Sequence, residues 1–204
     1  MGPEMFLKGL LFGFSIAAPV GPIGVLTIRR TLSDGRAAGF FTGLGAATAD
    51  AVYGSVGGFG ITLIADCLIS QRFWLGLLGG IFLCYLGIRT FLAAPSDQAS
   101  DLRSKGLLGS YLSTFLLTLA NPMTILSFTA AFTGLGLANQ SGSYQNAGLL
   151  VAGVFLGSTL WWFMLSGGVS RLRDRFDQAG LRWVNRVSGA IICGFGMIAL
   201  YSLI

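Results

Sequence analysis

Residues 16–54 read IAAPVGPIGVLTIRRTLSDGRAAGFFTGLGAATADAVYG. Pro19, Gly21 and Pro22 interrupt an apolar run, an arginine-containing segment follows, and a second apolar run carries Asp50. Proline lacks an N–H group and clashes with the carbonyl one turn back, and glycine tolerates non-helical dihedral angles. The stretch therefore predicts an interrupted helix, a polar turn, and a second helix with a carboxyl group at its centre.

The composition of the chain is that of a membrane protein. Its 204 residues are 53% hydrophobic and 10% charged, with a mean hydropathy of +0.75, whereas soluble domains carry about 25% charged residues. The long apolar runs lack the alternation of a transmembrane barrel. We therefore expect an all-α integral membrane protein with six transmembrane helices, at roughly 5–28, 38–64, 73–92, 107–132, 147–166 and 184–204.

The basic residues predict the orientation. Eleven of the 13 lie in or beside the first, third and fifth connections between these spans. Because cytoplasmic loops are enriched in Lys and Arg, these connections should be cytoplasmic and both termini should lie outside. This topology explains the net charge of +5 without nucleic acid as a partner. The fifth connection also holds Phe176 and Trp183, which would anchor it at the interface or touch anionic lipid.

The chain divides into two halves of three spans. We expect one transporter domain over 1–204, made of halves 1–92 and 107–204 joined by a cytoplasmic linker at 93–106. An odd number of spans per half gives the halves opposite orientations, as in the inverted repeats of secondary transporters. Asn121 and Pro122 interrupt helix four as the first prolines interrupt helix one. Paired breaks indicate a transport site; the alternative is a pair of kinks tolerated for packing.

Asp50 is the sharpest functional signal. It is the one acidic residue placed well inside a predicted span, where a carboxyl group costs about 2.5–3.5 kcal/mol on insertion scales. Burial favours the neutral form of a carboxyl group, so Asp50 is a candidate proton acceptor and donor, or a partner for a cationic substrate. The structural alternative is a protonated carboxyl that bridges two helices.

Other polar and aromatic residues form a second tier of candidates. They would line a path, bond across helices or sit at membrane interfaces: Thr48, Tyr53, Thr124, Ser127, Trp161 and Trp162. The chain has no histidine, and its three cysteines form no CxxC pair. We therefore expect neither a metal site nor a cofactor. Glycine seams such as Gly153–Gly157 suit close helix packing and would equally suit a homodimer.

The stretch at 16–54, together with LANPMTILSFTAAFTGLG at 119–136, resembles the LysE/RhtB family of amino-acid exporters over nearly the whole chain. The resemblance implies export of amino acids or related small metabolites from a bacterial inner membrane, driven by the proton-motive force, and no enzymatic activity. It also implies a central site of Pro19, Gly21, Pro22, Asp50, Asn121 and Pro122. The chain departs from the common family pattern at Val20, which separates Pro19 from Gly21, and at Ile23, which replaces a polar residue.

Three alternatives remain at this point. A divalent-cation exporter would need a richer set of ligands than one intramembrane carboxylate. A membrane thiol-transfer protein would need two apposed cysteines, and Cys67 and Cys84 do not form an evident pair. A non-transporting scaffold would leave the buried acid without a purpose.

Overall fold

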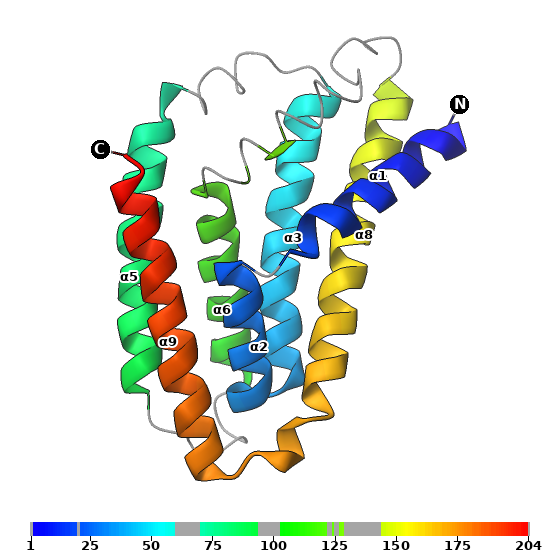
Figure 1. The fold of residues 1–204 in the computed structure, drawn as a ribbon. Coiled ribbons are helices and arrows are strands. Elements are labelled where there is room, and N and C mark those ends of the chain that lie inside the picture. Colours follow the sequence, from blue (N-terminus) through cyan, green and yellow to red (C-terminus); the bar gives the residue numbers. More distant parts are fainter. Residues whose placement is uncertain are drawn as a thin grey trace.

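The computed structural model describes residues 2–19, 21–59, 70–93, 103–121, 124, 127–128 and 144–203. Within these ranges all regular structure is helical, as the sequence predicted. The helices follow in the order α1 (Gly2–Ala17), α2 (Pro22–Asp34), α3 (Arg36–Gly58), α5 (Arg72–Leu92), α6 (Arg103–Leu119), α8 (Tyr144–Ser170), the 3₁₀ turn η2 (Arg173–Arg175) and α9 (Gln178–Tyr201) (Figure 1).

Three helices of the described part are long and apolar enough to cross a membrane: Phe73–Leu92, Tyr144–Ser170 and Gln178–Tyr201. α1 and α2 qualify together as one broken span, bent by 78°. Most of the predicted second span, 38–64, is described as α3, which is not among these candidate spans. The rest of that span and the end of the fourth, 107–132, run into residues outside the described ranges, so the count of six spans stays a prediction. So does the linker at 93–106, of which 94–102 lie outside those ranges.

The helices pack in a reciprocal pattern. α3 packs against α8, and α5 against α9. α1 packs against α8, whereas α6 packs against α3. In the two predicted halves α3 corresponds to α8, and α5 corresponds to α9; the members of each of these pairs contact each other. The first helices of the halves, α1 and α6, each contact the middle helix of the other half. This is the arrangement that an inverted repeat would produce, although the repeat itself stays a prediction.

Glycines allow α1 to cross α8 at close range. A Cβ atom at Gly9 would overlap the backbone carbonyl of Leu150, and one at Gly13 would overlap that of Val154. On the opposing helix, Gly153 and Gly157 face the α1 backbone in the same way. Small residues at such crossings bring helix backbones into van der Waals contact. The crossing fixes the direction of α1 and hence its angle to α2.

Both termini lie at one end of the bundle, and the α2–α3 and α8–α9 connections lie at the other (Figure 1). Gly35 joins α2 to α3 with a φ of 102°, a conformation that favours glycine. Arg173 of η2 donates from Nε to the carbonyl oxygen of Leu32 at 3.1 Å, which satisfies a carbonyl at the end of α2. The first and fifth basic connections thus share one end, and which compartment that end faces stays a prediction.

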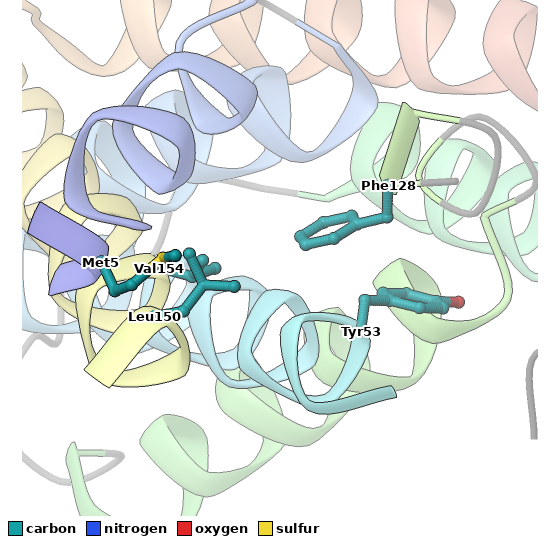
Figure 2. Packing of buried hydrophobic residues seen from close by; sticks show 5 residues of the cluster. All are labelled: Met5, Tyr53, Phe128, Leu150 and Val154. Atoms are coloured by element: carbon teal, nitrogen blue, oxygen red, sulfur yellow. The ribbon is translucent and has the colours of Figure 1, made fainter. Parts of the chain in front are cut away.

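The buried apolar residues of the described part form three clusters, one of which, around Trp162, borders on α1 and α3. Figure 2 shows another, in which Tyr53 and Phe128 lie beside one another and Met5, Leu150 and Val154 gather around α8. The ring centroids of Tyr53 and Phe128 are 5.4 Å apart. The third cluster, made of Leu26, Leu83, Leu117 and Ile192, joins α2, α5, α6 and α9.

Candidate functional site

Asp50 lies in the interior of α3 with only 5% of its surface exposed. Ser158 Oγ donates a hydrogen bond to Asp50 Oδ2 at 2.7 Å. Trp162 Nε1 in turn donates to Ser158 Oγ at 3.1 Å. Ser158 and Trp162 are one turn apart on α8, so they present one polar face to α3. Among the described residues, hydrogen bonds to Asp50 use only Oδ2.

Small residues on α3 allow this close contact. Ala46, Ala47 and Ala49 are almost fully buried, at 2%, 0% and 0% exposure. A Cβ atom at Gly43 would overlap the Trp162 side chain, and one at Gly45 would overlap the backbone carbonyl of Tyr111 on α6. α3 is therefore packed between α6 and α8 with no room for larger side chains at these positions. Its single carboxyl group is held away from bulk solvent.

A cavity of about 100 Å³ adjoins the Asp50 carboxyl group. This is room for several water molecules. The lining combines helix ends with a few polar side chains: Ile16, Ala17, Pro19, Gly21, Pro22, Ile23, Gly24, Ala46, Asp50, Thr118, Asn121, Thr124 and Trp162. Five of the six predicted central residues thus meet at one cavity, and the sixth, Pro122, lies outside the described residues.

The break between α1 and α2 forms one wall. α1 ends at Ala17, and α2 begins at Pro22 with Gly21 as its N-cap and without a side-chain cap. Proline is favoured at the first helical position because its missing N–H would have no partner there. The first N–H groups of a helix have no intrahelical acceptor and carry partial positive charge. The start of α2 therefore offers hydrogen-bond donors at the cavity.

The end of α6 forms the opposite wall. α6 ends at Leu119, and the N–H of Asn121 bonds the carbonyl of Thr118 at 3.2 Å. The first broken helix is thus mirrored by a helix that ends just before the Asn121–Pro122 pair. Helix C-termini carry partial negative charge, so α1 and α6 bring acceptors to a cavity where α2 brings donors.

The second-tier candidates divide between the cavity and other positions. Thr124 lines the cavity. Tyr53 donates from its hydroxyl to the Leu119 carbonyl at 2.6 Å, which ties α3 to the end of α6. Thr48 bonds the Leu44 carbonyl of its own helix at 2.9 Å. Trp161 packs edge-to-face on Phe14 of α1, with ring centroids 5.4 Å apart.

Sequence reasoning missed Ser158 and Thr118, because a single hydroxyl in an apolar helix gives no functional signal. The available signal was spacing: Ser158 precedes a tryptophan by one turn, and Thr118 continues a series of hydroxyl residues four apart on α6. Across the described ranges, no group of three or more His, Cys, Asp or Glu residues could hold a metal ion.

The fold and the cavity define a class: a multi-pass helical membrane protein with a buried acid beside a broken helix and the end of another. The family model described as LysE type translocator matches residues 14–203. The chain therefore belongs to the LysE type translocator family. The helical fold and the family both agree with the resemblance stated from the sequence, and the members of this family are translocators, not enzymes.

Relatives carry several descriptions. The chain is 30% identical to the Bacillus subtilis (strain 168) protein YcgF, whose description refers to amino acid efflux, over 95% of this chain and 93% of YcgF. It is 28% identical to the threonine efflux protein of Escherichia coli (strain K12), over 70% of this chain and 74% of that protein. It is also 28% identical to the chemotactic transduction protein ChpE of Pseudomonas aeruginosa, over 98% of both chains. No solved structure matches the chain.

Proposed function

We propose that this protein exports amino acids or related small metabolites across the bacterial inner membrane, and that Asp50 couples the export to proton entry. The observation that carries the proposal is the position of Asp50: a buried carboxyl group at a small cavity between the α1–α2 break and the end of α6. The descriptions of YcgF and of the threonine efflux protein support amino acids as the substrate class. Both termini would lie outside the cell, and the halves 1–92 and 107–204 would meet at the cavity.

The helix ends suit a zwitterion. A substrate carboxylate would accept hydrogen bonds from the free N–H groups at the start of α2, next to Gly21 and Pro22. The ammonium group would face the carbonyl ends of α1 and α6, together with Asn121 and Asp50. Backbone groups that no helix satisfies are tolerated in a membrane where they line such a cavity. The same arrangement would leave the side chain of the substrate toward the apolar lining.

Asp50 suits proton coupling because no fixed cation neutralises it. Among the described residues the one ion pair joins Arg29 and Asp34, and Asp50 bonds the neutral hydroxyl of Ser158. An acid inside a membrane without a basic partner is stable when protonated, or when a cationic ligand sits beside it. Asp50 would therefore take a proton from outside after the substrate leaves, and release it on the cytoplasmic side before the next substrate binds.

The Asp50→Asn variant tests this proposal. Purified protein is reconstituted in liposomes loaded with a panel of labelled amino acids, and the external medium is acidified. The wild-type chain should accelerate efflux of at least one compound, because proton entry drives substrate exit. Asp50→Asn should reduce this pH-driven efflux to background and keep exchange of substrate for substrate. Glu4→Gln, which removes an exposed carboxyl in the first turn of α1, is the matched control. Unchanged pH-driven efflux in Asp50→Asn contradicts the coupling.

One observation favours a thiol-transfer protein as a second candidate. Cys193 Sγ lies 3.5 Å from the Cys84 carbonyl across the α5–α9 contact, so these two cysteines are neighbours, although no pair is evident from the sequence. Cys67 lies outside the described residues. Neither lines the Asp50 cavity. A Cys84→Ser, Cys193→Ser double variant should keep pH-driven efflux, and its loss would favour thiol chemistry. Efflux that requires an added divalent metal would instead revive a cation exporter.

A further inference from the structure

A second and larger cavity lies between the ends of α2, α5 and α6, on the side of the bundle opposite the termini. Its volume is about 440 Å³. Three arginines line it, Arg29, Arg30 and Arg89, and one carboxylate, Asp34. The described lining therefore carries an excess of positive charge. A concave surface of one sign focuses the electrostatic field and concentrates ions of the opposite sign.

Arg30 is buried in the wall of this cavity with neutral partners. Its side chain is 8% exposed. The guanidinium donates to four oxygens: Thr42 Oγ1, the Ser110 carbonyl and Ser113 Oγ at 3.0 Å each, and Thr114 Oγ1 at 3.3 Å. The described residues provide it with no ion pair. Buried charges in proteins are normally paired, so the site calls for an anion.

The structure holds the two neighbouring arginines, Arg29 and Arg89, to different extents. Arg29 Nε donates to Asn185 Oδ1 at 2.9 Å, and the almost fully buried Asn185 donates to the Ala93 carbonyl at 3.1 Å. This amide holds the Arg29 head group in place. Arg89 is exposed on α5 and lies over the ring of Tyr85, 5.9 Å from its centroid. The cavity thus combines two anchored guanidinium groups with a third that can close over a ligand.

Polar side chains connect this cavity to Asp50. On α6, Ser110, Thr114 and Thr118 recur every four residues on one buried face. Thr114 bonds Arg30, and Thr118 lines the Asp50 cavity. On α3, Thr42 bonds Arg30 and precedes Asp50 by eight residues, about 12 Å along the helix axis. A row of buried hydroxyl groups on α6 therefore spans the distance from Arg30 to the Asp50 cavity, and Thr114 and Thr118 donate in the structure to carbonyls one turn back on their own helix.

We propose that the arginine cavity binds the carboxylate of the transported compound, and that the compound then moves along the hydroxyl groups of α3 and α6 to Asp50. The movement of the compound to Asp50 rests on the proposed function, whereas carboxylate binding at the arginines does not. Guanidinium groups suit carboxylates because their N–H groups form parallel, charge-assisted hydrogen bonds. Leu26 and Leu117 are buried on α2 and α6 between the two levels, so transfer requires these helices to move apart.

Two other anions could occupy the same arginines. Asp97 and Asp101 belong to the connection between α5 and α6 and lie outside the described residues. The phosphate of an anionic lipid shares the chemistry of the ligand, and basic pockets between membrane helices bind such head groups. The carboxylate of a solute is favoured because the hydroxyl row leads inward from Arg30 to the Asp50 cavity, a route that is useful only to a small molecule.

The binding test uses the full chain in discs of uncharged phosphatidylcholine, with acetate as the probe. Thermal unfolding is followed as acetate replaces chloride at constant ionic strength. The wild type should be stabilised progressively by acetate. Arg89→Gln, which removes the least anchored arginine, should need about tenfold more acetate for the same stabilisation, since a charge-assisted hydrogen bond is lost. Arg182→Gln, an exposed arginine of α9 outside the cavity, should behave as the wild type.

Three results of this binding test would overturn the proposal. Equal acetate responses in Arg89→Gln and in the wild type overturn the proposal. Stabilisation that depends on Arg89 only when phosphatidylglycerol replaces phosphatidylcholine, and not with acetate, identifies a lipid site and also overturns it. An acetate response that arises only in an Asp97→Asn, Asp101→Asn double variant also overturns the proposal, because the carboxylates of the linker would then occupy the cavity in the wild type.

The same preparations separate this inference from the proposed function. If acetate binding depends on Arg89 but pH-driven efflux survives Asp50→Asn, the carboxylate site stands and the proton-coupling proposal fails. If pH-driven efflux depends on Asp50 but acetate binding is insensitive to Arg89, the proton-coupling proposal stands and the carboxylate site fails. If efflux depends on Asp50 and acetate binding depends on Arg89, Arg89→Gln should raise the half-saturating substrate concentration for efflux about tenfold. The same variant should leave the maximal rate within about twofold.

Discussion

Asp50 and Arg30 are both buried, and neither forms an ion pair among the described residues, yet their surroundings differ. The Arg30 guanidinium is fixed by four oxygens from α3 and α6. The Asp50 carboxyl bonds Ser158 alone and adjoins a cavity at helix breaks. A group with many fixed partners keeps its position and charge, whereas a group with one neutral partner can change protonation. We therefore expect Arg30 to anchor a ligand or its neighbours, and Asp50 to switch between protonated and charged forms.

The walls of the two cavities differ as well. The Asp50 cavity is small and built from helix ends, and the closeness of those ends depends on the crossing of α1 over α8. The arginine cavity is about four times larger, at about 440 against 100 Å³. α1 does not line it. Changes at the α1–α8 crossing should therefore disturb one cavity and spare the other.

The largest expected effect comes from Gly13→Ala. The added Cβ would overlap the Val154 backbone carbonyl, which no rotamer change can relieve, so α1 must move away from α8. We expect a loss of about 3 kcal/mol in the free energy of unfolding and loss of pH-driven efflux. Acetate binding at the arginine cavity should remain in the fraction that folds, as measured by thermal unfolding in discs.

Gly148→Ala is the matched control for that experiment. It lies on α8, and a Cβ atom there meets nothing within 4 Å. Since alanine favours a helix over glycine by about 1 kcal/mol, this variant should be neutral or slightly more stable. Equal stability of Gly13→Ala and Gly148→Ala would contradict the close crossing of α1 and α8.

An intermediate effect is expected from Ser158→Ala. The variant removes the hydrogen bond to Asp50 and the acceptor for Trp162 Nε1, and a lost buried hydrogen bond costs about 1–3 kcal/mol. The pH dependence of efflux should change, because the carboxyl loses its only described partner. Ser166→Ala, whose hydroxyl bonds its own helix at Phe163, is the control. An unaltered pH profile in Ser158→Ala would show that this bond does not tune Asp50.

The smallest expected effect comes from Thr27→Val, on α2 between the two cavities. Thr27 is fully buried, and its hydroxyl has no hydrogen-bond partner in the described structure. Replacing an unsatisfied hydroxyl by a methyl group of similar volume should raise stability by about 1 kcal/mol. Slower efflux from a more stable protein would indicate that passing substrate uses this hydroxyl. A loss of stability would mean that the hydroxyl is satisfied after all.

Sequence patterns predicted the helices and the first break because those features are local. The prolines interrupt the backbone hydrogen bonds of a helix, and Gly21 tolerates extended dihedral angles, so α1 ends at Ala17 and α2 begins at Pro22, where the sequence indicates. Pro19, Asp50 and Asn121 line one cavity, and their role in transport stays a prediction. Arg173 illustrates the opposite case: the sequence identified it only as a basic residue of a cytoplasmic connection, but this side chain bonds the carbonyl end of α2.

Sequence alone determined that this chain is helical and membrane-embedded and where its first span breaks, and it singled out Asp50 as the acid placed well inside a predicted span. These properties follow from local backbone chemistry and from the cost of placing charge in lipid. Only the tertiary structure decided that Ser158 would be the partner of Asp50, and that Arg30 would be held by hydroxyls of two other helices. Such contacts join residues far apart in the chain, and their geometry depends on how closely glycines and alanines let the helices approach.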